Sequence, residues 1–181
     1  MLLHGAGTGV DAPALVGIGK AMAERGWDVT AIEQPYRVQG RKAPAPAAQL
    51  DEVVATVVRT VVSERRLGAP LVLIGRSSGG RVACRLASTL DAALVVALGF
   101  PLISPKGVSR QSELDRAGVP ILVVQGTKDG FGMPRRDARK SREVYRVDGA
   151  DHALERPRSL EDPLEEIVLE VAETLDAYAS T

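Results

Sequence analysis

A serine between two glycines is the feature of this sequence that points most directly to chemistry. Gly75, Ser77 and Gly79 form a Gly-x-Ser-x-Gly pattern directly after the apolar run 71–74. A serine on a tight turn from a strand into a helix needs neighbours without side chains where the backbone passes closest. Such a turn places the hydroxyl at a helix N-terminus, where free N–H groups and the helix dipole favour developing negative charge. The pattern therefore predicts a nucleophile at Ser77, and close packing of a strand on a helix is the competing explanation for the glycines.

A serine hydroxyl needs a base near neutral pH, and the sequence has two histidines. His4 lies in the glycine-rich segment 4–9, whereas His152 follows the last expected strand, downstream of Ser77. We therefore predict that His152 is the general base and that His4 is structural. The competing explanation for His152 is a structural histidine packed near the start of a helix.

An acid that orients the base is expected after a strand that lies between the serine and the histidine. Asp129 follows the apolar strand expected at 120–125 and is our candidate for this acid. Its alternative role is that of a turn or cap residue in a Lys-Asp-Gly sequence. The rival acids are Asp148, Asp151 and Glu33. Asp148 and Asp151 are so close to His152 in sequence that contacting Nδ1 while leaving Nε2 for the serine would be awkward.

Acyl transfer also needs two N–H donors that face the developing oxyanion. One commonly comes from the residue after the nucleophile and the other from an early loop, which predicts Ser78 and Ala6. The glycine-rich early segment has a second interpretation as a phosphate-binding loop. As a dinucleotide fingerprint it has Val10 where a third glycine is needed, and the surroundings of Gly19 and Lys20 do not fit a nucleotide-binding P-loop. Both nucleotide interpretations are therefore weak.

Apolar strand patterns alternate with helical patterns along the chain. The strand patterns lie at about 1–3, 29–33, 71–74, 93–98, 120–125 and 144–147. The helical patterns lie at about 11–25, 50–62 and 163–178, with a further helix that begins at Ser78. This alternation predicts an α/β fold with a mostly parallel sheet of about six strands and helices on both faces. Ligand sites of such sheets lie at the carboxyl ends of the strands, where the candidate residues fall.

Composition limits the classes of protein and partner. With 181 residues, 45% of them hydrophobic, the chain is long enough for one buried core, so we expect a single domain over residues 1–181. The 23 basic residues balance 23 acidic ones, which argues against nucleic acid or an anionic membrane as a partner. A single cysteine, Cys84, excludes an internal disulfide and favours a cytoplasmic location. We expect no metal and no organic cofactor, because two distant histidines and one cysteine make no ligand cluster.

The sequence also contains six segments in a fixed order: HGAG, PYR with GRKAP, GRSSGGR, FPL, QGTKDGFG and GADHAL. Together they resemble the small dienelactone-hydrolase-like branch of the α/β hydrolases, which includes testis-expressed and histone-acetyltransferase-complex-associated relatives. The resemblance implies a serine hydrolase of the carboxylic-ester type, with Ser77 as nucleophile, Asp129 as acid and His152 as base. It also implies a first strand that lies between the second strand and the strand before Ser77. Serine replaces the cysteine of dienelactone hydrolases proper, so their substrate is not carried over.

The substrate is expected to be a small-molecule ester bound in an open pocket. Only a short connection separates the strands at 93–98 and 120–125, where larger α/β hydrolases insert a lid, so we expect a minimal, lid-less form. Arg37 and Arg76 are candidates for binding an anionic group or for bracing loops, because a guanidinium can hold a carboxylate through two hydrogen bonds. A carboxylate-bearing ester is thus a hypothesis, and we expect Phe100 to be a further substrate contact.

Two further expectations concern partners. The alternative function is a hydrolase-like interaction module with an inactive site, whose surface binds a protein partner. A homodimer is possible through the second strand, because an unprotected sheet edge invites pairing with another chain.

Overall fold

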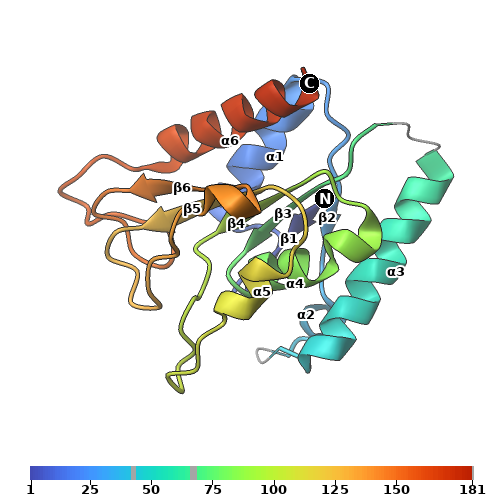
Figure 1. The fold of residues 1–181 in the computed structure, drawn as a ribbon, viewed down its shortest axis with the longest axis horizontal. Coiled ribbons are helices and arrows are strands. Elements are labelled where there is room, and N and C mark those ends of the chain that lie inside the picture. The colour runs from blue at the N-terminus through green and yellow to red at the C-terminus, as the bar shows by residue number, and fades with distance from the viewer. Residues whose placement is uncertain (42–43, 66–68, 181) are drawn as a thin grey trace.

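The structure is a computed structural model that describes residues 1–41, 44–65 and 69–180. Within these residues, six parallel strands form one sheet in the order β2-β1-β3-β4-β5-β6 (Figure 1). The strands are β1 (Leu2–Leu3), β2 (Ala31–Ile32), β3 (Val72–Arg76), β4 (Leu94–Leu98), β5 (Ile121–Gly126) and β6 (Arg142–Val147). The predicted parallel sheet is confirmed, and so is the position of the first strand beside both the second strand and the strand before Ser77.

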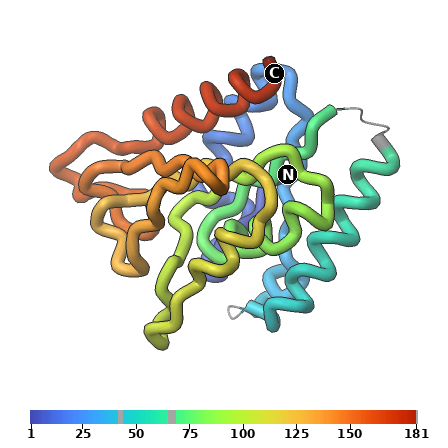
Figure 2. The backbone as a smooth tube through the Cα atoms, viewed as in Figure 1, coloured from blue at the N-terminus to red at the C-terminus, as the bar shows by residue number. Residues whose placement is uncertain are grey.

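Helices cover both faces of the sheet, as predicted (Figures 1 and 2). The α-helices are α1 (Pro13–Glu24), α2 (Pro35–Val38), α3 (Ala47–Arg65), α4 (Ser78–Leu86), α5 (Gln111–Asp115) and α6 (Leu164–Ala179). Two short 3₁₀ turns lie at Ser88–Leu90 and Ala138–Lys140. In both figures α1 runs beside α6 on one side of the sheet, whereas α3 and α4 lie on the other. None of the helices in the described ranges combines the length and the apolar character needed to cross a membrane.

The strands β1, β3, β4 and β5 contribute side chains to two separate hydrophobic cores, because successive side chains of a strand point to opposite faces. In β4, Leu94 and Val96 pack in the core under α1 and α6. Val95 and Ala97 of the same strand pack in the core under α3 and α4. All five residues of β4 are buried as a result. This double burial explains why the central strands have continuous apolar sequences rather than alternating ones.

The segment that contains Arg37 differs from the prediction. None of the helical patterns found in the sequence covers residues 35–38, whereas the structure has the four-residue helix α2 there. Proline suits the first turn of a helix, because its fixed φ is helical and its missing N–H would have no partner there. Tyr36 is only 4% exposed and packs in the core under α3 and α4. Burial of this ring therefore accompanies a helical turn directly after β2.

The connection between β4 and β5 contains the short helix α5, which packs on α4. Arg81 and Arg85 lie one turn apart on α4, and both bind Glu113 of α5, at 2.6 Å and 3.3 Å. Arg85 also binds Asp51 of α3 at 2.6 Å. Burial alone would raise the pKa of Glu113, but the hydrogen bond and charge of Arg81, together with the other arginines, lower it. These ion pairs join α3, α4 and α5 into one layer.

The helix α4 approaches the sheet so closely that backbone contacts backbone. A Cβ atom added to Gly79 would lie far inside the van der Waals distance of the Leu3 carbonyl oxygen. A Cβ atom added to Gly75 would overlap the Gly79 backbone in the same way. Packing therefore requires the two glycines of the Gly-x-Ser-x-Gly pattern, as the competing explanation given above proposed.

We expect Gly79→Ala to lower the free energy of unfolding by at least about 2 kcal/mol, because the new methyl group meets backbone atoms that cannot move aside. Urea denaturation followed by circular dichroism measures this change. Gly130→Ala is the matched control, since a Cβ atom there has nothing within 4 Å. Equal stability of the two variants would contradict the packing argument.

Candidate active site

Ser77 occupies a strained turn between β3 and α4. Its backbone has φ 50° and ψ −111°, a combination that few residues other than glycine adopt. The Ser77 N–H donates to the Leu98 carbonyl oxygen at 2.8 Å, which ties the turn to β4. Because α4 begins at Ser78, the Ser77 side chain lies at the N-terminus of that helix. The local geometry is thus the strand-turn-helix arrangement that the glycine spacing predicts.

The structure brings together the three residues that we predicted as nucleophile, base and acid. Ser77 Oγ lies 2.9 Å from His152 Nε2, and His152 Nδ1 lies 2.8 Å from Asp129 Oδ2. The three side chains come from the loops that follow β3, β5 and β6, which all end at the same rim of the sheet. The Asp129 side chain is fully buried, whereas the imidazole of His152 is 25% exposed. This arrangement can move a proton from the serine to the imidazole while the carboxylate holds the ring in place.

Gln125, which the sequence analysis did not select, holds the Asp129 carboxylate. Its Nε2 donates to Asp129 Oδ2 at 2.7 Å and to the Gly132 carbonyl oxygen at 2.9 Å. Its Oε1 accepts the Phe100 N–H at 2.8 Å. Gln125 is fully buried at the end of β5, and it is the one polar residue of an otherwise apolar strand. A buried polar side chain needs hydrogen-bond partners. A glutamine at the end of an apolar strand was therefore the sequence signal that could have identified this residue.

Phe131 completes the surroundings of the base, and it was also missed. Its backbone N–H donates to Asp129 Oδ1 at 2.8 Å. Its ring contacts the imidazole of His152 edge to face, with centroids 4.5 Å apart and planes at 70°. Phe131 follows Asp129 by two residues, and no spacing pattern marks it as a contact of a histidine in a distant loop. One residue thus contacts both the acid and the base.

The three rival acids lie elsewhere, and Glu33 Oε1 is 3.1 Å from His4 Nε2 rather than beside His152. Asp148 accepts a hydrogen bond from the Thr127 hydroxyl at 3.1 Å. Asp151 accepts the N–H groups of Ala153 and Glu155 at 2.8 Å and 3.2 Å, and so stabilises the turn that contains His152. Both carboxylates therefore stabilise loops, which leaves Asp129 as the acid that contacts the imidazole.

The turn after β1 lies against the serine. Leu3 of β1 is aligned with Gly75 of β3, so the residues that follow each strand meet at the rim. The position of a Cβ atom on Gly5 would be 3.5 Å from Ser77 Cβ. Among the residues that the structure describes, neither the Ala6 N–H nor the Ser78 N–H donates to a backbone carbonyl outside its own helix or strand. The role of these two donors in an oxyanion site stays a prediction.

His4 has structural contacts at both ring nitrogens. Its Nδ1 lies 2.7 Å from the Gly5 carbonyl oxygen, and its Nε2 accepts the Gln34 N–H at 3.0 Å. Its side chain is fully buried. These contacts agree with the structural role expected for His4, because they tie the turn after β1 to the end of β2.

Two of the three predicted substrate contacts have other partners. Phe100 is 0% exposed and packs in the core under α3 and α4, so its side chain offers no surface to a ligand. We correct our expectation for this residue and assign it a structural role. Arg37 Nε lies 3.9 Å from Glu33 Oε1, and its guanidinium is about one-third exposed. Arg37 therefore has a carboxylate partner within the protein.

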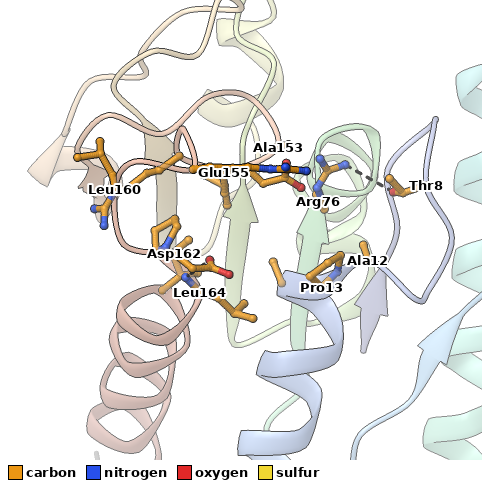
Figure 3. Close-up of a pocket in the computed structure, with 15 residues that line it drawn as sticks. Thr8, Ala12, Pro13, Arg76, Ala153, Glu155, Leu160, Asp162 and Leu164 are labelled. Carbon is orange, nitrogen blue, oxygen red and sulfur yellow. Dashed lines mark hydrogen bonds between the residues drawn. The ribbon is translucent and has the colours of Figure 1, made fainter.

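Arg76 is the third predicted contact, and it lines a cavity of about 600 Å³ beside the turn after β1 (Figure 3). Its Nη1 donates to the Thr8 hydroxyl at 3.5 Å, the dashed line in the figure. Arg76 is thus the predicted binding residue whose side chain opens onto a cavity.

Within the described ranges, no group of three or more His, Cys, Asp or Glu side chains is placed to hold a metal ion.

The chain was compared with known proteins. A family model described as an alpha/beta hydrolase domain matches residues 1–180. No curated protein matches the sequence. A crystal structure from Xanthomonas campestris, described as belonging to the alpha/beta superfamily, is similar with a TM-score of 0.72 and 20% identity, over 97% of this chain and 96% of that one.

Two further solved structures have the same fold at low sequence identity. The monoacylglycerol lipase of Paleococcus ferrophilus has a TM-score of 0.66 and 18% identity, over 98% of this chain and 93% of that one. A serine hydrolase without a lid from Xanthomonas campestris has a TM-score of 0.63 and 15% identity, over 98% and 79%. The likeness to the lipase and to the lid-less hydrolase is a likeness of fold alone.

We expect Gln125→Met to lower the free energy of unfolding by about 2 kcal/mol, because methionine leaves the buried Phe100 N–H without its acceptor. Urea denaturation measures the change. Gln49→Met, on the exposed side of α3, is the matched control and should alter stability by less than about 0.5 kcal/mol. A Gln125→Met protein as stable as the Gln49→Met protein would show that the hydrogen bonds of Gln125 do not support the fold.

Proposed function

The chain belongs to the alpha/beta hydrolase domain family, and on this basis we propose that it is a serine hydrolase that cleaves a carboxylic ester or thioester of a small molecule. The observation that supports this proposal most strongly is the pair of hydrogen bonds from Ser77 to His152 and from His152 to Asp129, at 2.9 Å and 2.8 Å. The lid-less form of the fold and the absence of nucleotide-binding motifs favour an open site for a small ester.

The first half of the proposed reaction forms an acyl-enzyme. His152 Nε2 accepts the Ser77 hydroxyl proton while Oγ forms a bond to the carbonyl carbon. The carbonyl oxygen becomes an oxyanion, which the N–H groups of Ala6 and Ser78 bind. Asp129 stabilises the imidazolium that has formed. His152 then gives its proton to the leaving oxygen or sulfur, the bond from carbon to that atom breaks, and the acyl group stays on Ser77.

The second half repeats the same steps with water. His152 accepts a proton from a water molecule as its oxygen bonds to the acyl carbon. The same two N–H groups bind the second oxyanion. The bond to Ser77 Oγ then breaks, His152 returns the proton to that oxygen, and the carboxylic acid leaves. Every proton in this scheme moves through one imidazole, so the scheme needs no cofactor.

Several finer points are proposals of the same kind. Membership of the dienelactone-hydrolase-like branch rests on the six sequence segments described above. A homodimer formed through β2 remains a prediction, based on the position of β2 at the edge of the sheet.

We expect Ser77→Ala to lower kcat for p-nitrophenyl butyrate by about a thousandfold or more, because the acyl-enzyme can no longer form. The native protein should also react with a fluorophosphonate probe, and the variant should not. Ser63→Ala, an exposed position on α3, is the control for both measurements. A folded native protein that neither hydrolyses the ester nor takes up the probe would favour the inactive interaction module instead.

We expect Asp129→Asn to lower kcat by about 10⁴-fold while the protein stays folded, because the amide favours the wrong tautomer of His152. Asp148→Asn, which changes the rival acid in the same way, should reduce kcat by less than about threefold, since Asp148 contacts Thr127 and not the imidazole. Steady-state kinetics on one neutral ester measure both. A larger loss for Asp148→Asn than for Asp129→Asn would assign the acid to the other position.

A further inference from the structure

The cavity in Figure 3 has a charged side and an apolar side. Arg76 and the segment 153–155, which follows His152, lie on one side. The starts of α1 and α6 lie across from them, where Ala12, Pro13 and Leu164 present apolar surface. A ligand with an anionic group at one end and a short aliphatic chain would match both sides.

The guanidinium of Arg76 lies close to the nucleophile. Its Nη1 is 2.9 Å from the position of a Cβ atom on Gly5, and Ser77 Cβ is 3.5 Å from that same point. Arg76 Nη1 and Ser77 Cβ can therefore be no further apart than the sum of these two distances. An anion held by Arg76 would lie only a few bonds from a carbonyl group positioned for attack by Ser77.

Arg76 differs from most of the other buried or partly buried arginines in its lack of a carboxylate partner. Arg110, which has none either in the part of the chain that the structure describes, donates to the Pro101 carbonyl oxygen at 3.1 Å. Arg81, Arg85 and Arg142 each have a carboxylate oxygen within 2.9 Å. Among the residues that the structure describes, no carboxylate oxygen lies within 4.0 Å of the Arg76 guanidinium, and its hydrogen bond is the long one to Thr8. Burial lowers the pKa of Arg76, and the more distant charges of Glu155, Asp151 and Asp129 partly oppose this. A half-buried cation without a partner is one that an anionic ligand would stabilise.

The remaining charged groups around the cavity are already partnered or exposed. Arg156 binds Glu166 at 2.7 Å. Asp162 accepts the Leu164 N–H at 3.0 Å and so caps α6. Glu155 and Arg158 are both exposed and have opposite charges. Among the cations that line the cavity, Arg76 is therefore the partly buried one that has no carboxylate oxygen within 4.0 Å in the described residues.

We propose that the cavity binds a carboxylate of the substrate, so that the protein cleaves an ester or thioester that bears a carboxylate a few bonds from the scissile carbonyl. This inference rests on the proposed function, because it assigns the substrate class of the same site. Arg76 would hold the carboxylate, and the apolar surface at the starts of α1 and α6 would contact the aliphatic part. Arg37 is not needed, since its partner is Glu33.

Two pairs of esters test the proposal on either side of the scissile bond. p-Nitrophenyl valerate and p-nitrophenyl hydrogen glutarate differ by a carboxylate in the acyl part. Phenyl acetate and 3-acetoxybenzoate differ by a carboxylate in the leaving part. Arg76→Gln should lower kcat/KM for the anionic member of at least one pair by about 10- to 100-fold more than for the neutral member of that pair, the difference expected for a charged hydrogen bond.

An exposed arginine far from the cavity in sequence provides the control for this experiment. Arg59→Gln removes an exposed positive charge from α3 and should change all four esters by less than about twofold. An equal loss on anionic and neutral esters in Arg76→Gln would overturn the proposal, because it would mean that Arg76 only braces the turn at Gly5 and Thr8. If Arg76→Gln fails to fold, the wild-type protein still decides: glutarate should inhibit p-nitrophenyl valerate hydrolysis competitively, and glutaramide at the same concentration should not.

A binding measurement separates this proposal from the proposed function. Ser77→Ala cannot turn over an ester, so calorimetry can follow the binding of monomethyl glutarate to it. Adding Arg76→Gln should weaken that binding by about tenfold or more. If monomethyl glutarate binding depends on Arg76 but the native protein hydrolyses no ester, the proposed carboxylate site is upheld and the proposed serine hydrolase activity is refuted. Hydrolysis of neutral esters by a protein whose binding of monomethyl glutarate ignores Arg76 would do the reverse.

Discussion

The close approach of α4 to β1 and β3 is the constraint on which the rest of the structure depends. Gly75 and Gly79 allow the helix to begin directly against the sheet backbone, at the carbonyl oxygen of Leu3. Ser77 must then turn the chain within one residue, and it does so with a positive φ that costs about 1–3 kcal/mol. Two packed cores, one on each face of the sheet, hold this turn in place. The strained backbone of Ser77 is thus held in place by the packing of two cores that extend well beyond the turn.

Burial of one carboxylate organises the opposite side of the site. The Asp129 side chain has no exposed surface, so its oxygens need donors from within the protein. Gln125, His152 and the Phe131 N–H supply them. Gln125 must in turn be polar in an apolar strand, and its second function is to pair with the backbone of Phe100. The segment after β4, the end of β5 and the loop that contains Asp129 are joined through this single amide.

The arginines show how pairing rather than residue type separates structural charges from available ones. Arg81 and Arg85 join helices through bound carboxylates, and Arg142 at the start of β6 is buried against Asp115. Arg76 is partly buried and has no such partner among the described residues. In a sequence these side chains are equivalent, because the pairing depends on which strand ends and helix faces become neighbours.

The sequence by itself determined the α/β class and the parallel sheet, together with the rim at which the candidate residues meet. These follow from hydrophobic spacing and from local steric needs such as those of Gly75 and Gly79, which act over a few residues. The position of β1 within the sheet was implied by the family resemblance. Only the tertiary structure decided that Phe100 is core, that Pro35 begins a helix, that Gln125 holds Asp129 and that Arg76 has no carboxylate partner among the described residues. Those facts depend on distances between side chains that are remote along the chain, and such distances are set by how the layers pack.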